Sequence, residues 1–254
     1  MSITARRVTP YRFGSAYRAD ELRLELRALQ RCPANLPADF AESERFSTHY
    51  SQAIVAQELT GLPQPGGAYE QACQLIARYE FSDPRIVTGH FDSAQPLLGR
   101  TMLLEMRAFG FRFLGGVRVT AVRNRQTRDR SSFGFRYDTL SGHLECGSES
   151  FTVTKCHSTG DIWLRMSAAW RPGDFPTWWS RIGFAIVGGR YQRAWHRAAY
   201  LRMRSLLGAE ALPQLPPLGR ILRPGRTLTA AAAGGMGTRR SRPEIPSERG
   251  SLAR

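Results

Sequence analysis

The sequence predicts an α+β domain in which a curved antiparallel sheet is covered by a long C-terminal helix. Between about residues 102 and 170, apolar side chains alternate with polar ones, which is the period of half-buried strands. From about Asp174 onward, apolar side chains instead recur every three or four residues, as on an amphipathic helix. A sheet with one apolar face and a helix with one apolar stripe are expected to bury these surfaces against each other.

The first eighty residues are expected to form three short helices. Their apolar stripes are formed by Leu22, Leu26 and Leu29, by Phe46, Tyr50 and Ile54, and by Tyr69, Cys73 and Ile76. Asp20 is expected to cap the first of these helices. Because a segment shorter than about 70–80 residues rarely builds a core of its own, we expect the helices to pack on the domain that follows.

The strands are expected to form an antiparallel meander. Residues 102–122 should hold two strands, broken near Gly115 and Gly116, and a charged turn should follow over residues 123–130. Three further extended segments are expected over residues 133–141, 143–155 and 162–170, joined by short turns. The short connections place consecutive strands side by side.

The chain is expected to divide into three parts. An N-terminal helical extension covers residues 1–68, the sheet-and-helix domain covers residues 69–208, and a basic tail covers residues 209–254. The tail is rich in Pro, Gly, Ala and Arg and has no apolar periodicity, which is typical of disorder.

The net charge of +15 raises the alternative of a nucleic-acid or anionic-surface binding protein. All but one of the basic residues are arginines, and part of the excess lies in the tail. Arginines of the C-terminal helix could form a phosphate-binding face; they are Arg190, Arg193, Arg197, Arg202 and Arg204. A solvated helix face is the commoner explanation of such arginines, so nucleic acid is not the favoured partner.

Cysteine usage and the N-terminal sequence bear on compartment and metals. No two of the four cysteines form a Cys-x-x-Cys pair, so a structural zinc site is not expected. No signal peptide is evident, and we expect a cytoplasmic location with reduced thiols. No run of 18 apolar residues is present, so no transmembrane segment is expected. The sequence does not determine the oligomeric state.

One stretch, residues 133–151, resembles the signature of an uncharacterised family, DUF1990. The shared pattern is Gly-Phe-x-Tyr-x-Thr-Leu-x-Gly-His-x-Glu-x-Gly-x-Glu-x-Phe, and it is matched from Gly134 to Phe151. A looser resemblance extends from about Tyr79 to Met203. The sequence departs from the family at residues 168–172, where Ala-Ala-Trp-Arg-Pro stands in place of Ala-Phe-Ser-Arg-Pro.

The resemblance implies a helix-grip (START-like, Bet v 1-like) architecture. It further implies a binder of an apolar or amphipathic small molecule, held in a cavity between the sheet and the C-terminal helix. The chemistry of the family is not established, so the resemblance assigns no catalytic residue and no cofactor.

His143, Glu145 and Glu149 are the first candidate site residues, because their even spacing places them on one face of a regular strand. They could form a metal site or an acid–base pair, so an enzyme that uses His143 with Glu145 or Glu149 stays open as an alternative. In the structural alternative His143 orders a turn and binds local backbone or carboxylate groups, with no metal. Gly142 and Gly147 are then expected to serve folding more than ligand contact.

Aromatic side chains on the strands are the remaining candidates, either as pocket lining or as ordinary core. The predicted ligand-binding set is Tyr137, His143, Glu145, Glu149, Trp163 and Trp170. Trp178, Trp179 and Trp195 belong to the same aromatic group on the helix.

Overall fold

The computed structural model describes residues 10–36, 46–173 and 178–209, together with Leu212 and Leu215; over residues 178–189 it describes the backbone alone. In chain order the elements are β1 (Tyr11–Phe13), α1 (Ala19–Leu29), β2 (Ser47–Gln57), α2 (Ala68–Ala77), β3 (Val87–His90), β4 (Thr101–Ala108), β5 (Phe111–Gln126), β6 (Arg130–Thr139), β7 (Glu145–Cys156), β8 (Asp161–Pro172) and α3 (Trp178–Leu206). The expected start of the last helix, near Asp174, and the tail beyond residue 215 lie outside the described residues.

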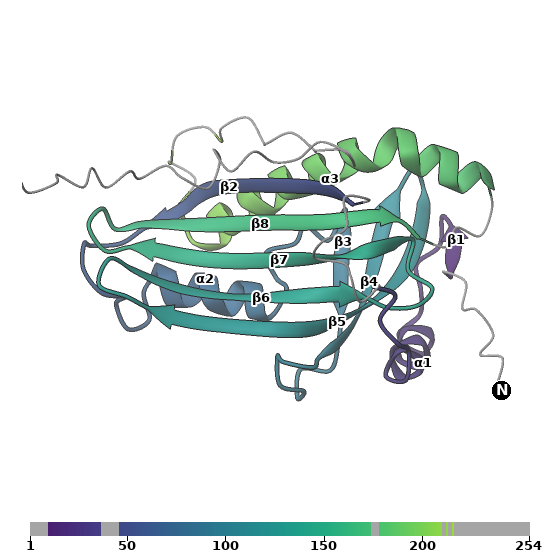
Figure 1. Cartoon of the computed structure of the whole chain (residues 1–254), viewed down its shortest axis with the longest axis horizontal. Helices are drawn as coiled ribbons and strands as arrows, with labels where there is room; N and C mark the ends of the chain where they lie inside the picture. The colour runs from purple at the N-terminus through teal and green to yellow at the C-terminus, as the bar shows by residue number, and fades with distance from the viewer. Residues whose placement is uncertain (1–9, 37–45, 174–177, 210–211, 213–214, 216–254) are drawn as a thin grey trace, which may run out of the picture.

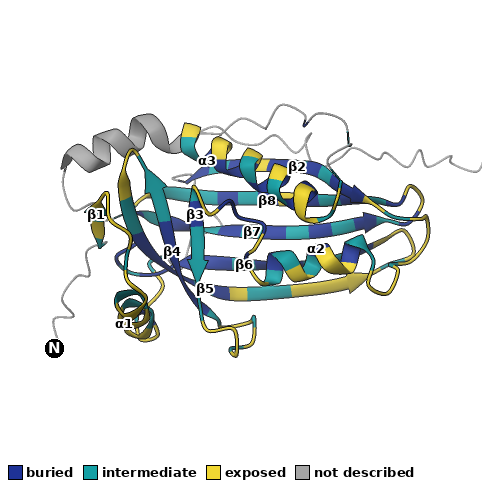
Figure 2. Ribbon diagram, turned by 180° about the vertical axis from the view of Figure 1, so that it is seen from behind, coloured by how far each residue is buried: buried dark blue, intermediate teal, exposed yellow. Residues whose placement is uncertain are grey.

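A curled antiparallel sheet dominates the fold (Figure 1). Its strand order is β2-β8-β7-β6-β5-β4-β3, and β1 pairs with β5. Figure 2 shows α2 and α3 on the same side of this sheet. The expected α+β architecture, an antiparallel curved sheet closed by a long C-terminal helix, is therefore confirmed.

The main core lies between the sheet and these two helices. Strand β8 shows why: Ile162, Leu164 and Met166 are fully buried, whereas the residues between them are half-buried or exposed. The helices add Ile76 from α2 and Tyr200 from α3 to the same cluster. Alternation along the strands thus sends one set of side chains into the core, as expected.

Strand β2 corrects the sequence analysis, which expected a helix over Phe46, Tyr50 and Ile54. The segment is an edge strand that pairs with β8, and it is part of the sheet rather than of a helical extension. Its buried positions alternate, but the first three of them hold the polar residues Ser47, His49 and Ser51. Because these side chains are not apolar, the sequence shows no alternation of apolar and polar residues here. The spacing of Phe46, Tyr50 and Ile54 resembles that of a helix by chance.

The turn between β4 and β5 is a second correction. The break expected at Gly115 and Gly116 lies instead at Phe109 and Gly110, which both have positive φ. Both expected glycines lie inside β5, where they are buried. A glycine pair inside a strand marks a close approach of other groups as readily as a turn.

Helix α1 packs on the opposite face of the sheet from α2 and α3. Leu29 is 1% exposed and forms a second cluster with Leu103, Leu114 and Leu140. The N-terminal helix therefore packs on the domain, as expected. Asp20 is not its N-cap: Arg18 holds that position, and the Glu21 carboxylate accepts the Arg18 N–H at 2.6 Å.

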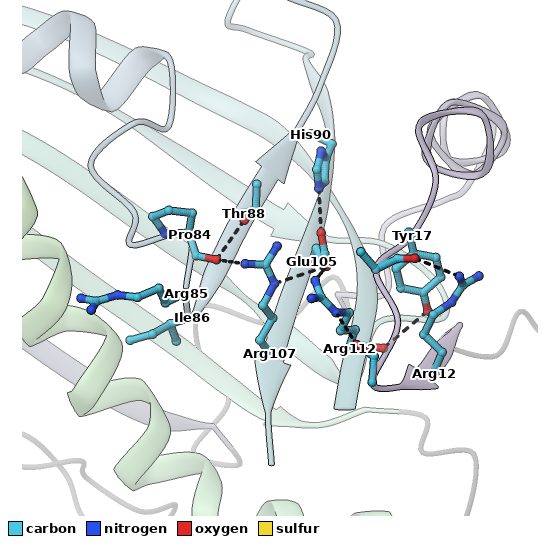
Figure 3. Close-up of polar contacts among 12 residues, drawn as sticks. Arg12, Tyr17, Pro84, Arg85, Ile86, Thr88, His90, Glu105, Arg107 and Arg112 are labelled. Atoms are coloured by element: carbon cyan, nitrogen blue, oxygen red, sulfur yellow. Dashed lines mark hydrogen bonds and ion pairs between the residues drawn. The ribbon is translucent and has the colours of Figure 1, made fainter. Parts of the chain in front are cut away.

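A charged cluster on the face that α1 covers links β3, β4 and β5 (Figure 3). Glu105 is 3% exposed and accepts hydrogen bonds from His90, Arg107 and Arg112. The bond from His90, followed by those from the two arginines, holds the pKa of Glu105 at about 2, although burial opposes this shift. Tyr17 adds a bond to the Arg112 carbonyl and so ties the N-terminal segment to the cluster.

Candidate functional site

A cavity of about 80 Å³ lies between the sheet and α3. Apolar side chains form part of its wall, including Val87 from β3, Leu104 and Met106 from β4, and Trp195 from α3. The other part of the wall is polar and comes from β6, from β7 and from the turn that joins them. The cavity therefore has an apolar side and a polar side, which is the usual character of a small-molecule site.

Five of the six predicted site residues line this cavity: Tyr137, His143, Glu145, Glu149 and Trp170. Trp163 is not part of the lining. It stands between Ile162 and Leu164, which both point into the core, so its side chain is on the other face of β8. Trp178 and Trp179 fall within the part of α3 for which only the backbone is described.

Glu149 has the most elaborate surroundings of the lining residues. Tyr137 donates to its Oε2 at 2.6 Å, and Nε2 of His196 lies 3.1 Å from its Oε1. The other ring nitrogen of His196, Nδ1, lies 2.7 Å from the Ser51 hydroxyl. The Ser51 hydroxyl in turn lies 2.7 Å from the Tyr200 hydroxyl. A continuous hydrogen-bonded chain therefore runs from the cavity to the interface of α3 with β2.

Burial decides the charge of this chain. It raises the pKa of Glu149 to about 8 and lowers the pKa of His196 to about 3. Near pH 7 the pair is thus a neutral carboxylic acid beside a neutral imidazole. In that state the carboxyl donates to Nε2 of His196, and Nδ1–H of His196 donates to Ser51.

The same residue types occur in hydrolytic triads, but here their order is reversed. Glu149 lines the cavity, whereas Ser51 and His196 do not. A serine nucleophile needs access to substrate, and Ser51 is buried behind the histidine. The group that this chain presents to the cavity is therefore the carboxyl of Glu149.

Glu145 is the second carboxyl of the cavity wall. Burial, reinforced by the charge of Glu149, raises its pKa to about 8. Among the described residues, no hydrogen bond reaches its side chain. Glu145 and Glu149 lie on one face of β7 with Gly147 between them, as their even spacing predicted.

His143 is fixed by its own turn. Its Nδ1 accepts the Glu145 backbone N–H at 3.0 Å, which confirms the expected local backbone partner. This bond leaves the proton on Nε2, and burial lowers the pKa of His143 to about 4, so the ring is neutral. Gly142, at φ 84°, makes the turn, and a side chain on Gly115 would meet the His143 ring at 2.3 Å.

Buried polar atoms of the cavity lining include some with no hydrogen-bond partner among the described residues. Among them are Nε2 of His143, a donor, and Oε1 of Gln192, an acceptor. Native proteins rarely leave such groups unpaired in their interior. The cavity is therefore ready to accept a polar group or water.

His196, Ser51 and Gln192 were missed by the sequence analysis. Gln192 and His196 are four residues apart on α3, so they share the helix face that Tyr200 also occupies. A polar pair in the apolar stripe of a long helix was the signal that could have revealed them. Ser51 gave no such signal, because its strand was not recognised.

Two of the five arginines expected to form a phosphate-binding face on α3 are bound to backbone carbonyls within the fold. Arg190, Arg193 and Arg197 are exposed, but Arg202 donates to the Glu80 carbonyl and Arg204 donates to the Ile54 carbonyl. Arg204 is thereby buried in the helix–strand interface. No group of three or more His, Cys, Asp or Glu side chains suited to a metal ion occurs within the described residues. None of the described helices is long and apolar enough to cross a membrane.

The comparisons with known proteins give one family match. The model of a family described as "Domain of unknown function (DUF1990)" matches residues 38–202. The match begins well before Tyr79, where the resemblance was expected to start, and so includes β2. No curated protein matches the chain.

Several solved structures are distantly similar. A norcoclaurine synthase mutant of Thalictrum flavum is 8% identical, with a TM-score of 0.41 over 65% of this chain and 97% of that one. The hypothetical protein jhp0584 of Helicobacter pylori is 10% identical, with a TM-score of 0.41 over 68% and 95%. Major latex-like protein 151 of Panax ginseng is 15% identical, with a TM-score of 0.33 over 59% and 97%.

Proposed function

The chain belongs to DUF1990, a family of domains of unknown function, and from this premise we propose that it is a non-catalytic binder of a small amphipathic molecule. The ligand occupies the cavity between the sheet and α3. Its apolar part lies against Val87, Leu104 and Met106, and its polar end lies against the His143, Glu145 and Glu149 side.

The unpaired polar atoms carry this proposal. An unsatisfied buried donor or acceptor costs about 1–3 kcal/mol, so the free Nε2–H of His143 and the free Oε1 of Gln192 favour an occupant with both hydrogen-bonding capacities. A hydroxyl or neutral amine group can both accept from His143 and donate to Gln192. The apolar part of the ligand then excludes water from the apolar side chains of the wall.

The size of the cavity limits the ligand. Pockets for drug-sized molecules hold roughly 300–1,000 Å³, and this cavity holds about 80 Å³. The ligand is therefore small, or its binding moves α3 outward from the sheet.

A cavity-filling variant tests the proposal. Ala168 lines the cavity and Ala169 lies on the other face of β8, so Ala168→Leu fills the site and Ala169→Leu is its matched control. The full-length protein is analysed by native mass spectrometry for a co-purified small molecule and by amide NMR titration with 1-hexanol. We expect ligand signals in the wild type and in Ala169→Leu, and their loss in Ala168→Leu. Equal signals in both variants, or none in the wild type, would contradict the proposal.

A second candidate, an acid–base enzyme, is favoured by one observation. The carboxyl of Glu149 faces the cavity, is oriented by Tyr137 and His196, and has a pKa of about 8. A pKa near the working pH is what general acid–base catalysis requires. The probe is 5-nitrobenzisoxazole, whose ring opens when a base removes its proton. A rate that rises through about pH 8 and is lost in Glu149→Gln supports catalysis, and an unchanged rate in that variant excludes Glu149 as the base.

A further inference from the structure

We infer that the cavity selects molecules with a protonated amine at the end of an apolar body, and that Glu149 and Glu145 receive the amine. This inference rests on the proposed binding function and specifies its ligand class. It follows from two carboxyl groups in the cavity wall and from the lack of an arginine or lysine side chain among the described residues that line it.

The other buried carboxyl groups of the described chain have cationic partners. These pairs are Asp83 with Arg85, Glu105 with Arg112, Asp138 with Arg136, and Glu58 with Lys155. The protein has 36 arginine and lysine residues. Even so, no arginine or lysine side chain among the described residues lines the cavity. Glu145 and Glu149 are thus carboxyl groups of a cavity wall to which the described residues contribute no arginine or lysine side chain.

A bound ammonium group would provide the missing partner. It has three N–H donors, and the wall offers the two carboxyl groups and the unpaired Oε1 of Gln192 as acceptors. An ammonium group cannot accept a hydrogen bond, so the Nε2–H of His143 takes its acceptor from another atom of the ligand or from water. A buried carboxylate becomes favourable only when an opposite charge and hydrogen bonds compensate for its lost hydration. Both oxygens of Glu149 already have a protein partner, Tyr137 at Oε2 and His196 at Oε1, so a bound ammonium group would add a further hydrogen bond to a carboxylate that the fold holds in place.

Binding of this ligand is coupled to proton release. The pKa values of both carboxyl groups are about 8, so near pH 7 most of the acids are protonated and one must lose its proton to pair with an ammonium ion. Affinity for an amine should therefore rise with pH up to about 8. An alcohol forms no ion pair, so its affinity should stay constant over this range.

The other titratable groups near the carboxyls do not interfere between pH 6 and 8. They are Tyr79, Tyr137 from β6, Tyr191, His196 and Tyr200 from α3, and His143 from the turn before β7. Burial raises the pKa of each of these tyrosines and lowers the pKa of both histidines to about 4 or below. His49 is a further ionisable side chain packed on this group, with its ring centroid 4.5 Å from that of His196. We assign the expected pH dependence to the two carboxyl groups, because they line the cavity and His49 does not.

Calorimetric titration of the full chain with n-hexylamine and 1-hexanol tests the inference, near pH 6 and near pH 8. Two buffers with different ionisation enthalpies give the number of protons released. We expect hexylamine to bind about tenfold more tightly per pH unit gained below the carboxyl pKa, with close to one proton released near pH 7. Glu149→Gln and Glu145→Gln should weaken the binding of hexylamine more than that of hexanol, and should reduce the rise of hexylamine affinity with pH.

The outcomes separate this inference from the proposed function. If hexanol binds and hexylamine binds no better at either pH, the amine inference fails and the binding function stands. If neither probe binds the wild type, both fail. Should Glu149→Gln not fold, as judged by its amide NMR spectrum, Glu145→Gln and the proton count of the wild type decide the matter.

Discussion

Glu149 and His196 lie 47 residues apart in the chain and meet at the buried interface of sheet and helix, where Nε2 of His196 lies 3.1 Å from Oε1 of Glu149. This contact joins the polar wall of the cavity to α3. Ser51 and Tyr200 continue the chain of hydrogen bonds from His196. The histidine therefore contacts both a carboxyl group that lines the cavity and a hydroxyl group buried between α3 and β2.

Replacing His196 by Leu should therefore destabilise the protein by about 2–4 kcal/mol, because it leaves the Glu149 carboxyl and the Ser51 hydroxyl buried with one partner fewer. Urea denaturation near pH 7 measures the change. The neighbouring Arg197 is exposed, so Arg197→Leu is the control and should change stability by less than about 0.5 kcal/mol. Equal effects of the two substitutions would show that the histidine contact adds nothing to stability.

Stability should decline above about pH 6.5. The folded-state pKa values of Glu145 and Glu149 are raised from 4.5 to about 8, so their contribution is fully present below 4.5 and is lost as pH rises toward 8. The pKa values of His143 and His196 are lowered from 6.5 to about 4 and about 3, so their contribution is lost as pH falls below 6.5.

These opposing slopes offset each other between about pH 4.5 and 6.5, where we expect a plateau of stability. Urea denaturation at a series of pH values measures the profile. Glu145→Gln should flatten the decline above pH 6.5, because glutamine does not titrate. A wild-type stability that keeps rising from pH 6.5 to 8 would contradict the raised pKa values.

Glu105 should give a pH dependence of opposite sign. Its pKa is lowered from 4.5 to about 2 by the bonds from His90, Arg112 and Arg107, so its contribution is present above 4.5 and is lost as pH falls toward 2. Glu105→Gln should therefore be less stable than the wild type near pH 7 and should approach it near pH 2. Thermal denaturation at both pH values provides the comparison, and a constant difference would argue against the ionised cluster.

The packing of α1 can be tested with two leucines of the same helix. Leu29 is 1% exposed against the sheet, whereas Leu24 is 69% exposed. Leu29→Ala should cost about 2–5 kcal/mol through lost burial and the cavity that remains, and Leu24→Ala should cost less than about 0.5 kcal/mol. Chemical denaturation measures both. A small effect at Leu29 would mean that the N-terminal helix does not contribute to the fold.

Gly142 is required by its backbone angle. At φ 84°, Gly142→Val should destabilise by about 1–3 kcal/mol, and Gly142→Asn should cost less because asparagine tolerates positive φ. Differential scanning calorimetry ranks the two variants. An unchanged melting temperature for Gly142→Val would overturn this assignment.

The strand residues of the site could be predicted because they obey a local rule. Tyr137, His143, Glu145, Glu149 and Trp170 lie in or beside β6, β7 and β8, whose alternating apolar residues are visible in the sequence. The same rule should have excluded Trp163, which follows Ile162 by one position. The long helix was equally visible, because its stripe spans many turns.

The sequence by itself thus determined the strands from β4 to β8, the long helix and the face on which the two glutamates lie. Only the tertiary structure decided that β2 is a strand, and that His196 and Gln192 face those glutamates. A strand is recognised in a sequence when apolar and polar residues alternate. This pattern is absent from β2, where buried positions hold the polar residues His49 and Ser51. The pairing of Glu149 with His196 depends on how the sheet curls against α3. That packing depends on contacts between segments far apart in the sequence, so it cannot be predicted from the order of neighbouring residues.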